Sequence, residues 1–200
     1  MDRLGLGGAV TGLRQESGQG RIAGRAVTVK LDVGPPPEGP PRHLCTAAIE
    51  SAGPDDVIVV EQRTGVDAGS WGGLLTRGAL ARAIPGVIVD GPVRDIDEAR
   101  ELGFAVFTNR TTCFTARGRV VEVANRQPVR VGSVIVEAGD YALADNSGVV
   151  FIKPADIEQV LAVAEAIVAR EAAMAKAIAN GAPISRVLGG DYEHMLKEEP

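Results

Sequence analysis

The sequence contains few of the residues on which several common kinds of protein depend. Only 4% of its 200 residues are aromatic, it has no run of basic residues, and its formal net charge is −5. A surface that binds nucleic acid is therefore not expected. No apolar stretch reaches the roughly 20 residues that cross a membrane, and the N-terminus lacks the apolar core of a signal peptide. Two isolated cysteines, Cys45 and Cys113, indicate a cytoplasmic protein rather than a disulfide framework.

What the sequence does contain is the composition of a folded globular domain. Hydrophobic residues make up 45% of the chain and charged residues 24%, and a chain of this length can bury a sizeable core. We predict a single domain over residues 1–200, in which a long Ala-rich helix at about 155–181 is followed by a tail at 182–200.

Apolar runs typical of buried strands alternate with helical segments in the first half of the chain. The expected strands cover 21–33, 56–61, 87–90 and 105–108, and the expected helices cover 43–52, 74–83 and 95–102. The Pro-rich segment 34–41 is expected to be a loop. Alternation at this spacing predicts βαβ units and a parallel sheet. From 118 to 152, period-two patterns between turn residues predict a β-rich second layer.

Two loops that follow expected strands carry the candidate chemistry. The first, TGVDAGSWGG, leads through Gly72 and Gly73 into the helix that begins near Leu74. Unpaired amide groups at a helix start, together with the helix dipole, favour a small anion such as a carboxylate. A glycine-rich turn with a purely structural role is the alternative. Neither a Walker loop nor a dinucleotide fingerprint is present.

The second loop follows the strand at 87–90 and an expected Gly-Pro turn. Arg94 offers a planar fork for a carboxylate, and Asp95 offers oxygen to a hard divalent cation. If the two strands are neighbours, the two loops meet and suit a 2-oxo acid whose carbonyl is polarised by a metal. The alternative is structural: Asp95 and Glu98 form a capping box at the start of a helix, and Arg94 makes a surface ion pair.

Other polar residues are expected to serve the structure. Asp90 ends a strand and should satisfy turn N–H groups, and the acids Asp97 and Glu98 complement the dipole at a helix start. Cys113 has no nearby histidine or cysteine, and His43 is predicted to be a solvated residue at a helix start. The acid–base residue is not identified by the sequence.

The two loops and the elements between them form one stretch, WGGLLTRGALARAIPGVIVDGPVRDIDEARELGFAVF. This stretch resembles the 4-hydroxy-4-methyl-2-oxoglutarate/4-carboxy-4-hydroxy-2-oxoadipate aldolase family, which is related to the regulator of ribonuclease activity A (RraA-like). In matching order, the segment GPDDVIVVE precedes it and GDYALADNSGVVFI follows it, so the resemblance covers roughly residues 4 to 190. Its specific part is the Gly-x-Val-Arg-Asp turn after a buried strand that ends in Asp-Gly.

The resemblance implies a layered α/β/β/α sandwich of the swivelling-domain kind, assembled into homotrimers or homohexamers with sites between subunits. It also implies that Arg94 contacts the substrate and that Asp95 binds Mg²⁺ or Mn²⁺. An acid from the late helix of a neighbouring subunit would complete the metal's water shell; Glu171 is the first match and Glu165 the second. The pyruvate carboxylate would be held by backbone amides at Gly72, Gly73, Leu74 and Leu75.

Two features depart from the family pattern. The aldolases carry an acidic residue twenty-one positions before the arginine, where this chain has Gly73, so one carboxylate that would order metal-bound water is missing. The chain also begins where the family already has a helix, which indicates a missing N-terminal element or an internal start. The non-enzymatic ribonuclease regulators typically lose the aspartate of the Arg-Asp pair, which this sequence keeps as Asp95.

The sequence therefore favours a divalent-metal-dependent lyase of the class II pyruvate aldolase kind. It would act on pyruvate-like 2-oxo acids by retro-aldol cleavage of 4-hydroxy-2-oxo acids, by oxaloacetate decarboxylation, or by both. Both reactions pass through the pyruvate enolate, which the metal and Arg94 would stabilise. A non-catalytic RraA-like binding or regulatory protein is the alternative. A third hypothesis is an enzyme of changed substrate, in which another group replaces the acid missing at Gly73.

Overall fold

The computed structural model describes residues 1–36, 38–39 and 42–189. The chain divides into two compact units, one of residues 9–152 and one of residues 1–8 and 153 onward. The larger unit contains the sheets and three of the helices. The smaller unit contains the short 3-10 helix η1 (Asp2–Leu4), the long helix α4 (Ile157–Ala179) and the single turn α5 (Ile184–Val187).

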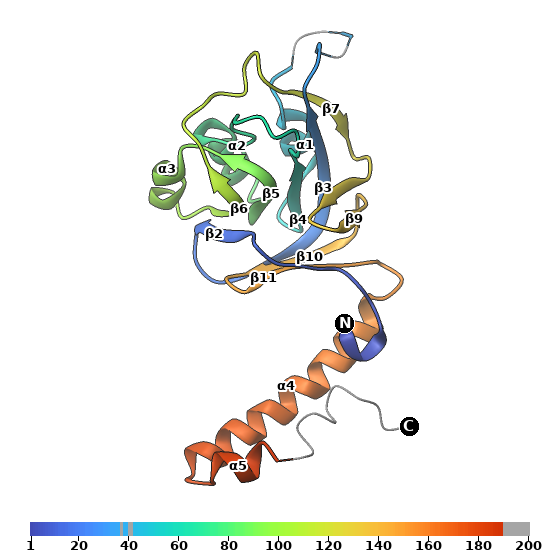
Figure 1. Cartoon of the computed structure of the whole chain (residues 1–200), viewed down its shortest axis with the longest axis vertical. Coiled ribbons are helices and arrows are strands. Elements are labelled where there is room, and N and C mark those ends of the chain that lie inside the picture. The colour runs from blue at the N-terminus through green and yellow to red at the C-terminus, as the bar shows by residue number, and fades with distance from the viewer. Residues whose placement is uncertain (37, 40–41, 190–200) are drawn as a thin grey trace. The chain divides into compact units, whose positions relative to one another are not determined.

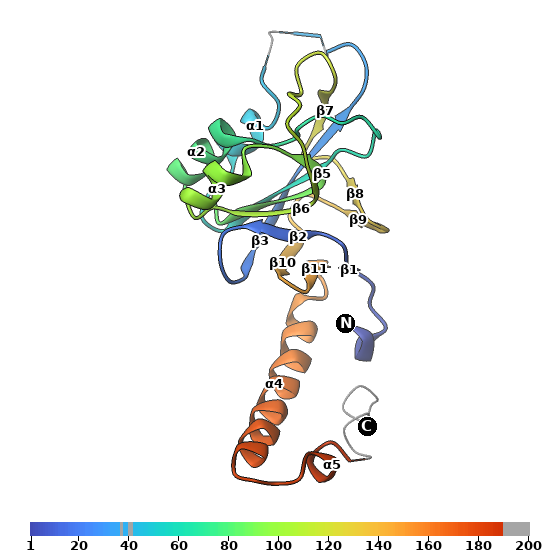
Figure 2. The ribbon, with the colours of Figure 1, turned by 60° about the vertical axis from the view of Figure 1, so that its left-hand side comes forward.

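Four parallel strands form the centre of a nine-stranded sheet (Figure 1). They lie side by side in the order β3 (Ile22–Asp32), β4 (Asp56–Glu61), β5 (Gly86–Val93) and β6 (Ala105–Thr111). The connecting helices are α1 (Thr46–Ser51), α2 (Gly73–Ala81) and α3 (Ile96–Glu101). All three helices lie on one face of the central strands (Figure 2). This is the βαβ arrangement expected from the alternation of apolar runs and helical segments.

Further strands cover the opposite face and extend both edges of the sheet. The antiparallel additions are β1 (Ala9–Val10), β2 (Arg14–Ser17), β7 (Val121–Asn125), β10 (Tyr141–Asp145) and β11 (Gly148–Ile152). A separate hairpin, β8 (Val129–Val131) with β9 (Val134–Val136), lies on the face away from the helices (Figure 2). The predicted α/β class, with parallel βαβ units and a β-rich second layer, is confirmed.

Two apolar cores lie on the two faces of the central sheet. Ile58 and Val60 of β4 pack into the core under the helices, whereas Val57 and Val59 pack into the core under the β-rich layer. Successive side chains of a strand point to opposite faces. A continuously apolar run such as 56–61 is therefore what a strand buried on both faces requires.

The strand β5 is longer than the sequence predicted. It continues through Gly91 and Pro92 to Val93, and all eight of its residues are buried. The prediction of a Gly-Pro turn after Asp90 is therefore wrong. The pairing with β6 shifts register between Val89 and Pro92, and such a bulge is one of the few places where a sheet accepts proline.

Other elements agree with the sequence to within a few residues. The helix expected at 43–52 begins at Thr46, and the helix expected at 155–181 covers 157–179. The strands β1 and β2 were not predicted. In the loop expected at 34–41, residues 37, 40 and 41 lie outside the described residues, as does the part of the tail from 190 on. Within the described ranges, no helix is both long enough and apolar enough to cross a membrane.

Candidate functional site

The two loops singled out in the sequence meet at one edge of the central sheet. The strands β4 and β5 are parallel neighbours, so the loops that follow them lie at the same end. Two backbone hydrogen bonds join the loops: Ser70 N–H donates to the Pro92 carbonyl at 2.8 Å, and Arg94 N–H donates to the Trp71 carbonyl at 3.1 Å. The two loops therefore meet, as expected if their strands are neighbours.

Asp95 connects the second loop to the start of α2. Its backbone is left-handed, with φ 60° and ψ 38°, a conformation that aspartate tolerates better than most residues. Its Oδ2 accepts a hydrogen bond from Gly73 N–H at 2.9 Å and lies 3.1 Å from Arg94 Nε. Asp95 thus binds the positive end of a different helix from the one that it precedes.

The capping-box alternative for Asp95 and Glu98 is wrong. Asp95 is the N-cap residue of α3, but its side chain makes no capping hydrogen bond to that helix. The carboxylate of Glu98 instead pairs with Arg77 of α2, with 2.7 Å between Arg77 Nε and Glu98 Oε1. The carboxylates of Asp95 and Glu98 therefore both contact the neighbouring helix α2.

Arg94 is held along its length and exposed at its end. Its Cγ lies against Gly69, where an added Cβ would come within 3.0 Å, so the glycine makes room for the side chain. The ion pair expected of Arg94 as a surface residue is present, with Asp95 as its partner. This contact uses Nε and leaves the two terminal nitrogens of the guanidinium to meet an anion, and 41% of the side chain is exposed.

These residues line a pocket of about 350 Å³, a volume suited to a small organic acid. Its lining consists of His43, Leu44, Gly69, Trp71, Gly72, Gly73, Leu74, Leu75, Arg94, Asp95, Glu98, Thr115 and Ala116. A second pocket of about 760 Å³ shares four of these residues, His43, Leu44, Thr115 and Ala116. Arg42 and Arg117 are also in its lining.

The first turn of α2 supplies the backbone amides expected to bind an anion. The helix begins at Gly73 after the N-cap Gly72, and the first N–H groups of a helix have no acceptor within it. Gly73 N–H donates to Asp95, which leaves the amides of Leu74 and Leu75 for a ligand. The structure thus brings all the candidate residues of the two loops together, with one amide of the four already occupied.

Several residues of the pocket were not recognised as site residues from the sequence. His43 was expected to be a solvated residue at a helix start, and it is exposed, but it also lines the pocket. Thr115 and Ala116 come from the connection between β6 and β7, far along the chain. Nothing in the local pattern points to them. Glu98 carried one local signal, its spacing of three positions from Asp95, but that spacing is also typical of a capping box.

The described residues offer carboxylate oxygens that a divalent cation could use, but they do not provide a complete ligand set. Among the described residues, no group of three or more His, Cys, Asp or Glu side chains could hold a metal ion. Asp95 provides one carboxylate, of which Oδ2 is already hydrogen-bonded. Such a sparse oxygen site fits Mg²⁺ or Mn²⁺, because Mg²⁺ typically keeps several waters and takes one or two carboxylates plus substrate oxygens. The candidates Glu171 and Glu165 lie exposed on α4.

Neither cysteine is in the lining of this pocket, and Cys45 is not suited to act as a nucleophile. Cys45 is fully buried, and burial raises the pKa of its thiol well above the usual value, with a smaller contribution from the negative charge of Glu122. A thiol held neutral in this way is a poor nucleophile. Cys113 is exposed, and both cysteines are free.

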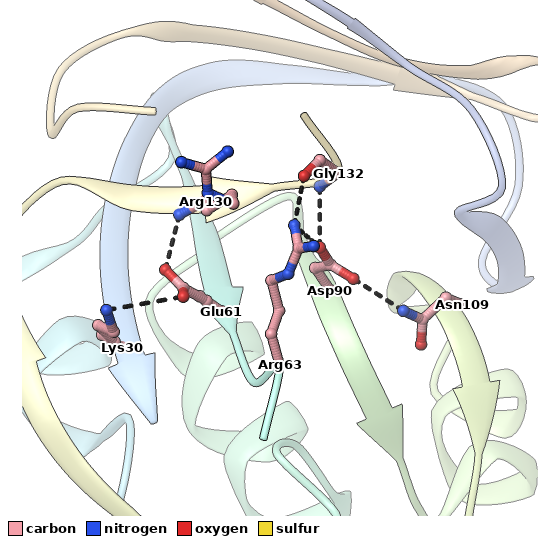
Figure 3. Close-up of polar contacts among 7 residues, drawn as sticks. All are labelled: Lys30, Glu61, Arg63, Asp90, Asn109, Arg130 and Gly132. Carbon is pink, nitrogen blue, oxygen red and sulfur yellow. Dashed lines mark hydrogen bonds and ion pairs between the residues drawn. The ribbon is translucent and has the colours of Figure 1, made fainter. Parts of the chain in front are cut away.

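Asp90 belongs to a separate polar cluster between the central strands and the β8–β9 hairpin (Figure 3). Its Oδ2 accepts a hydrogen bond from Gly132 N–H at 2.8 Å, and its Oδ1 accepts one from Asn109 Nδ2 at 2.8 Å. Arg63 lies 3.4 Å from Asp90 Oδ2 and donates to the Gly132 carbonyl. These contacts attach the β8–β9 hairpin to the sheet, so the structural role predicted for Asp90 agrees with its contacts.

Comparison with known proteins places the chain in one family. The family model described as RraA-like, Aldolase/RraA, matches residues 1–151. Protein DlpA of Legionella pneumophila is 27% identical over 186 residues, which are 93% of this chain and 30% of that protein. A protein of Halalkalibacterium halodurans named "Putative 4-hydroxy-4-methyl-2-oxoglutarate aldolase" is 30% identical over 133 residues, which are 66% of this chain and 63% of that protein. The chain thus spans less than two thirds of the length of either relative.

Solved structures share the fold. An uncharacterised protein from Pseudomonas syringae pv. tomato superposes with a TM-score of 0.82 at 26% identity, covering 94% of this chain and 88% of the other. Streptomyces coelicolor RraAS2, described as an unusual member of the RNase ES inhibitor RraA protein family, gives a TM-score of 0.71 at 26% identity, covering 80% and 81%. The match of three quarters of the sequence to one family model, on the same fold, means that this chain belongs to the RraA-like (Aldolase/RraA) family.

Proposed function

We propose that this protein is a divalent-metal-dependent lyase that releases pyruvate from 2-oxo acids. The reactions are retro-aldol cleavage of 4-hydroxy-2-oxo acids and decarboxylation of oxaloacetate. The observation that carries the proposal is the convergence of Arg94, Asp95 and the first turn of α2 on one pocket. An aldolase name among the relatives supports the same reaction class.

Each group of the pocket suits one part of a pyruvate-like substrate. The amides of Leu74 and Leu75, at the positive end of α2, would bind the carboxylate. The terminal nitrogens of Arg94 would donate to the 2-oxo oxygen as it gains negative charge in the enolate. Asp95 would hold Mg²⁺ or Mn²⁺, and a bound cation polarises the same carbonyl. The remainder of a larger substrate would extend toward the second pocket, past His43 and Thr115.

A screen for pyruvate release tests the proposal. Oxaloacetate and 4-hydroxy-4-methyl-2-oxoglutarate are each incubated with the protein, and pyruvate is measured by coupling to lactate dehydrogenase. Activity should disappear after treatment with a chelator and return with Mg²⁺ or Mn²⁺. Full activity in the chelated protein would contradict the metal requirement.

A second candidate function is non-catalytic binding or regulation. Two observations favour it. Gly73 occupies the position at which the aldolases carry an acid. The similar structure of Streptomyces coelicolor RraAS2 is described as a member of the RNase ES inhibitor RraA protein family. This function predicts that no 2-oxo acid is turned over under any metal condition, although the pocket binds pyruvate.

We further propose that the protein works as a homotrimer or homohexamer in the reducing cytosol. Both cysteines are free, and α4 exposes the apolar side chains Leu161, Val168 and Ile178, which would be covered in an assembly. Glu171 of α4 is the proposed acid that a neighbouring subunit adds to the metal's water shell. Mixed oligomers of Arg94→Ala and Glu171→Ala subunits should then regain part of the activity that each variant loses. An active monomer would contradict a shared site.

A further inference from the structure

Glu98 occupies the space that a side chain at position 73 would fill. A Cβ added to Gly73 would lie 1.7 Å from Glu98 Oε2 and 2.5 Å from Glu98 Cδ, which is far inside the contact distance of two atoms. A side chain at position 73 and the present conformation of Glu98 therefore exclude one another. The carboxylate missing from the start of α2 is replaced, at the same place, by a carboxylate from α3.

One oxygen of the Glu98 carboxylate is held by a hydrogen bond, and the other is available to a ligand. Its Oε1 accepts a charge-assisted hydrogen bond from Arg77 Nε at 2.7 Å, which orients the side chain. Its Oε2 faces Gly73 and makes no hydrogen bond within the described part of the chain. The side chain is 34% exposed and lines the pocket together with Arg94 and Asp95. An oriented carboxylate with a free oxygen beside a binding pocket is the arrangement that proton transfer requires.

We propose that Glu98 is the proton-transfer residue of this site and that Gly73 is the residue that makes room for it. This inference rests on the proposed lyase function. In the retro-aldol direction, Glu98 Oε2 accepts the proton of the substrate's 4-hydroxyl group. The C3–C4 bond breaks, the C4–O bond becomes a carbonyl, and the electron pair of the broken bond forms the pyruvate enolate. Protonated Glu98 then returns its proton to C3, which gives pyruvate and restores the carboxylate.

Arg77 is a positioning residue in this scheme. It is on the second turn of α2 and its side chain is 58% exposed, so it touches Glu98 but is not in the pocket lining. Arg77 and Glu98 are therefore a matched pair for testing. Loss of either removes the same ion pair, but only loss of Glu98 removes the carboxylate that transfers the proton.

The test compares Glu98→Gln with Arg77→Gln in the full-length protein. Glutamine at 98 keeps the size of the side chain and can still accept a hydrogen bond from Arg77. We expect Glu98→Gln to lower kcat for 4-hydroxy-4-methyl-2-oxoglutarate about 10²- to 10⁴-fold, the contribution of a positioned proton-transfer group. Arg77→Gln should lower it by no more than about 10-fold, because an exposed ion pair contributes little, and Arg77→Lys should recover part of that loss.

Two further measurements separate proton transfer from other roles. Binding of Mn²⁺ alone, measured by calorimetry, should be the same in Glu98→Gln and in the parent protein. Exchange of the C3 hydrogens of pyruvate with D₂O, followed by NMR, should slow in Glu98→Gln by a factor similar to the loss in kcat, because this exchange requires proton transfer at C3 without C–C cleavage.

The outcomes distinguish this inference from the proposed function. Equal losses in Glu98→Gln and Arg77→Gln would overturn the inference and leave Glu98 as a partner of Arg77 only. Loss of Mn²⁺ binding in Glu98→Gln would also overturn it, because Glu98 would then be a metal ligand. If the parent and the Glu98→Gln variant are equally active, the inference is contradicted but the proposed function still holds. If the parent protein releases no pyruvate, both the proposed function and the inference are contradicted.

Discussion

Asp90 and Asp95 are five positions apart in the sequence and differ in almost every physical respect. Asp90 lies within the buried strand β5, is 9% exposed, and accepts hydrogen bonds on both oxygens. Asp95 follows the strand in a left-handed conformation, its side chain is 33% exposed, and its contacts to Gly73 and Arg94 all involve Oδ2.

The difference fits the proposed function, in which Asp95 serves the chemistry of the site and Asp90 serves the stability of the fold. A buried carboxylate is tolerated only when its oxygens are paired, and Asp90 uses them to attach the β8–β9 hairpin to the sheet (Figure 3). A carboxylate that binds a cation or substrate must keep an oxygen available, as Asp95 does with Oδ1. Asp95→Asn should therefore lower the activity, and Asp90→Asn should lower the stability of the fold.

The largest effect should come from Asp95→Asn. Asparagine tolerates the left-handed backbone as well as aspartate does and can accept the Gly73 hydrogen bond, but it lacks the charge that would hold the proposed divalent cation. We expect pyruvate release to fall about 10³-fold or more, while the thermal unfolding midpoint stays near that of the parent. Steady-state rates at saturating Mg²⁺ and a thermal melt measure the two effects. Retention of the parent rate would exclude Asp95 as a metal ligand.

A smaller loss of activity is expected for Arg94→Lys. Lysine keeps the positive charge but cannot present two parallel N–H donors, so it should be nearly as damaging as Arg94→Ala, with a loss of about 10²-fold in kcat/KM. Both variants should remain folded, because the Arg94 side chain is 41% exposed. A lysine variant that works at the parent rate would leave Arg94 with only its ion pair to Asp95.

The matched variant in the structural cluster is Asp90→Asn. One asparagine cannot accept hydrogen bonds on both of its terminal atoms, so either Asn109 or Gly132 loses its acceptor. We expect the free energy of unfolding to fall by about 1–3 kcal/mol, with the activity of the folded molecules unchanged. Urea unfolding measures the first effect, and the rate per folded molecule measures the second. A loss of activity that exceeds the loss of folded protein would connect Asp90 to the site.

The sequence was sufficient to predict that the two loops meet, but other residues of the pocket arrive through contacts between distant segments. Arg94 and Asp95 could be predicted to lie beside the start of α2, because their motif follows a buried strand and the neighbouring strand leads into that helix. The bulge that carries β5 through Gly91 and Pro92 could not be predicted, because Gly-Pro usually marks a turn. His43 and Thr115 reach the pocket from loops far away in the sequence, and no local pattern reports such a meeting.

Glu98 shows a different limit of the sequence. Its spacing from Asp95 is typical of a capping box, and the same spacing also places two carboxylates on one side of a helix. The contact that decides between the two is with Arg77 and Gly73 of another helix. A local pattern with two physical interpretations is therefore resolved only by tertiary packing.

The smallest effect is expected within the structural cluster itself, at Arg63. This arginine contacts Asp90 at 3.4 Å and the Gly132 carbonyl, but 41% of its side chain is exposed. Solvent screens an exposed pair, so Arg63→Met should lower the free energy of unfolding by about 1 kcal/mol or less, and methionine retains much of the apolar length of the arginine stem. If the hairpin is held mainly by the hydrogen bond from Gly132 N–H to Asp90, the double variant Arg63→Met, Asp90→Asn should be scarcely less stable than Asp90→Asn alone. Urea unfolding of the parent, the two single variants and the double variant gives the coupling energy directly. A loss in Arg63→Met as large as that in Asp90→Asn would show instead that the ion pair, and not the backbone hydrogen bond, attaches the hairpin.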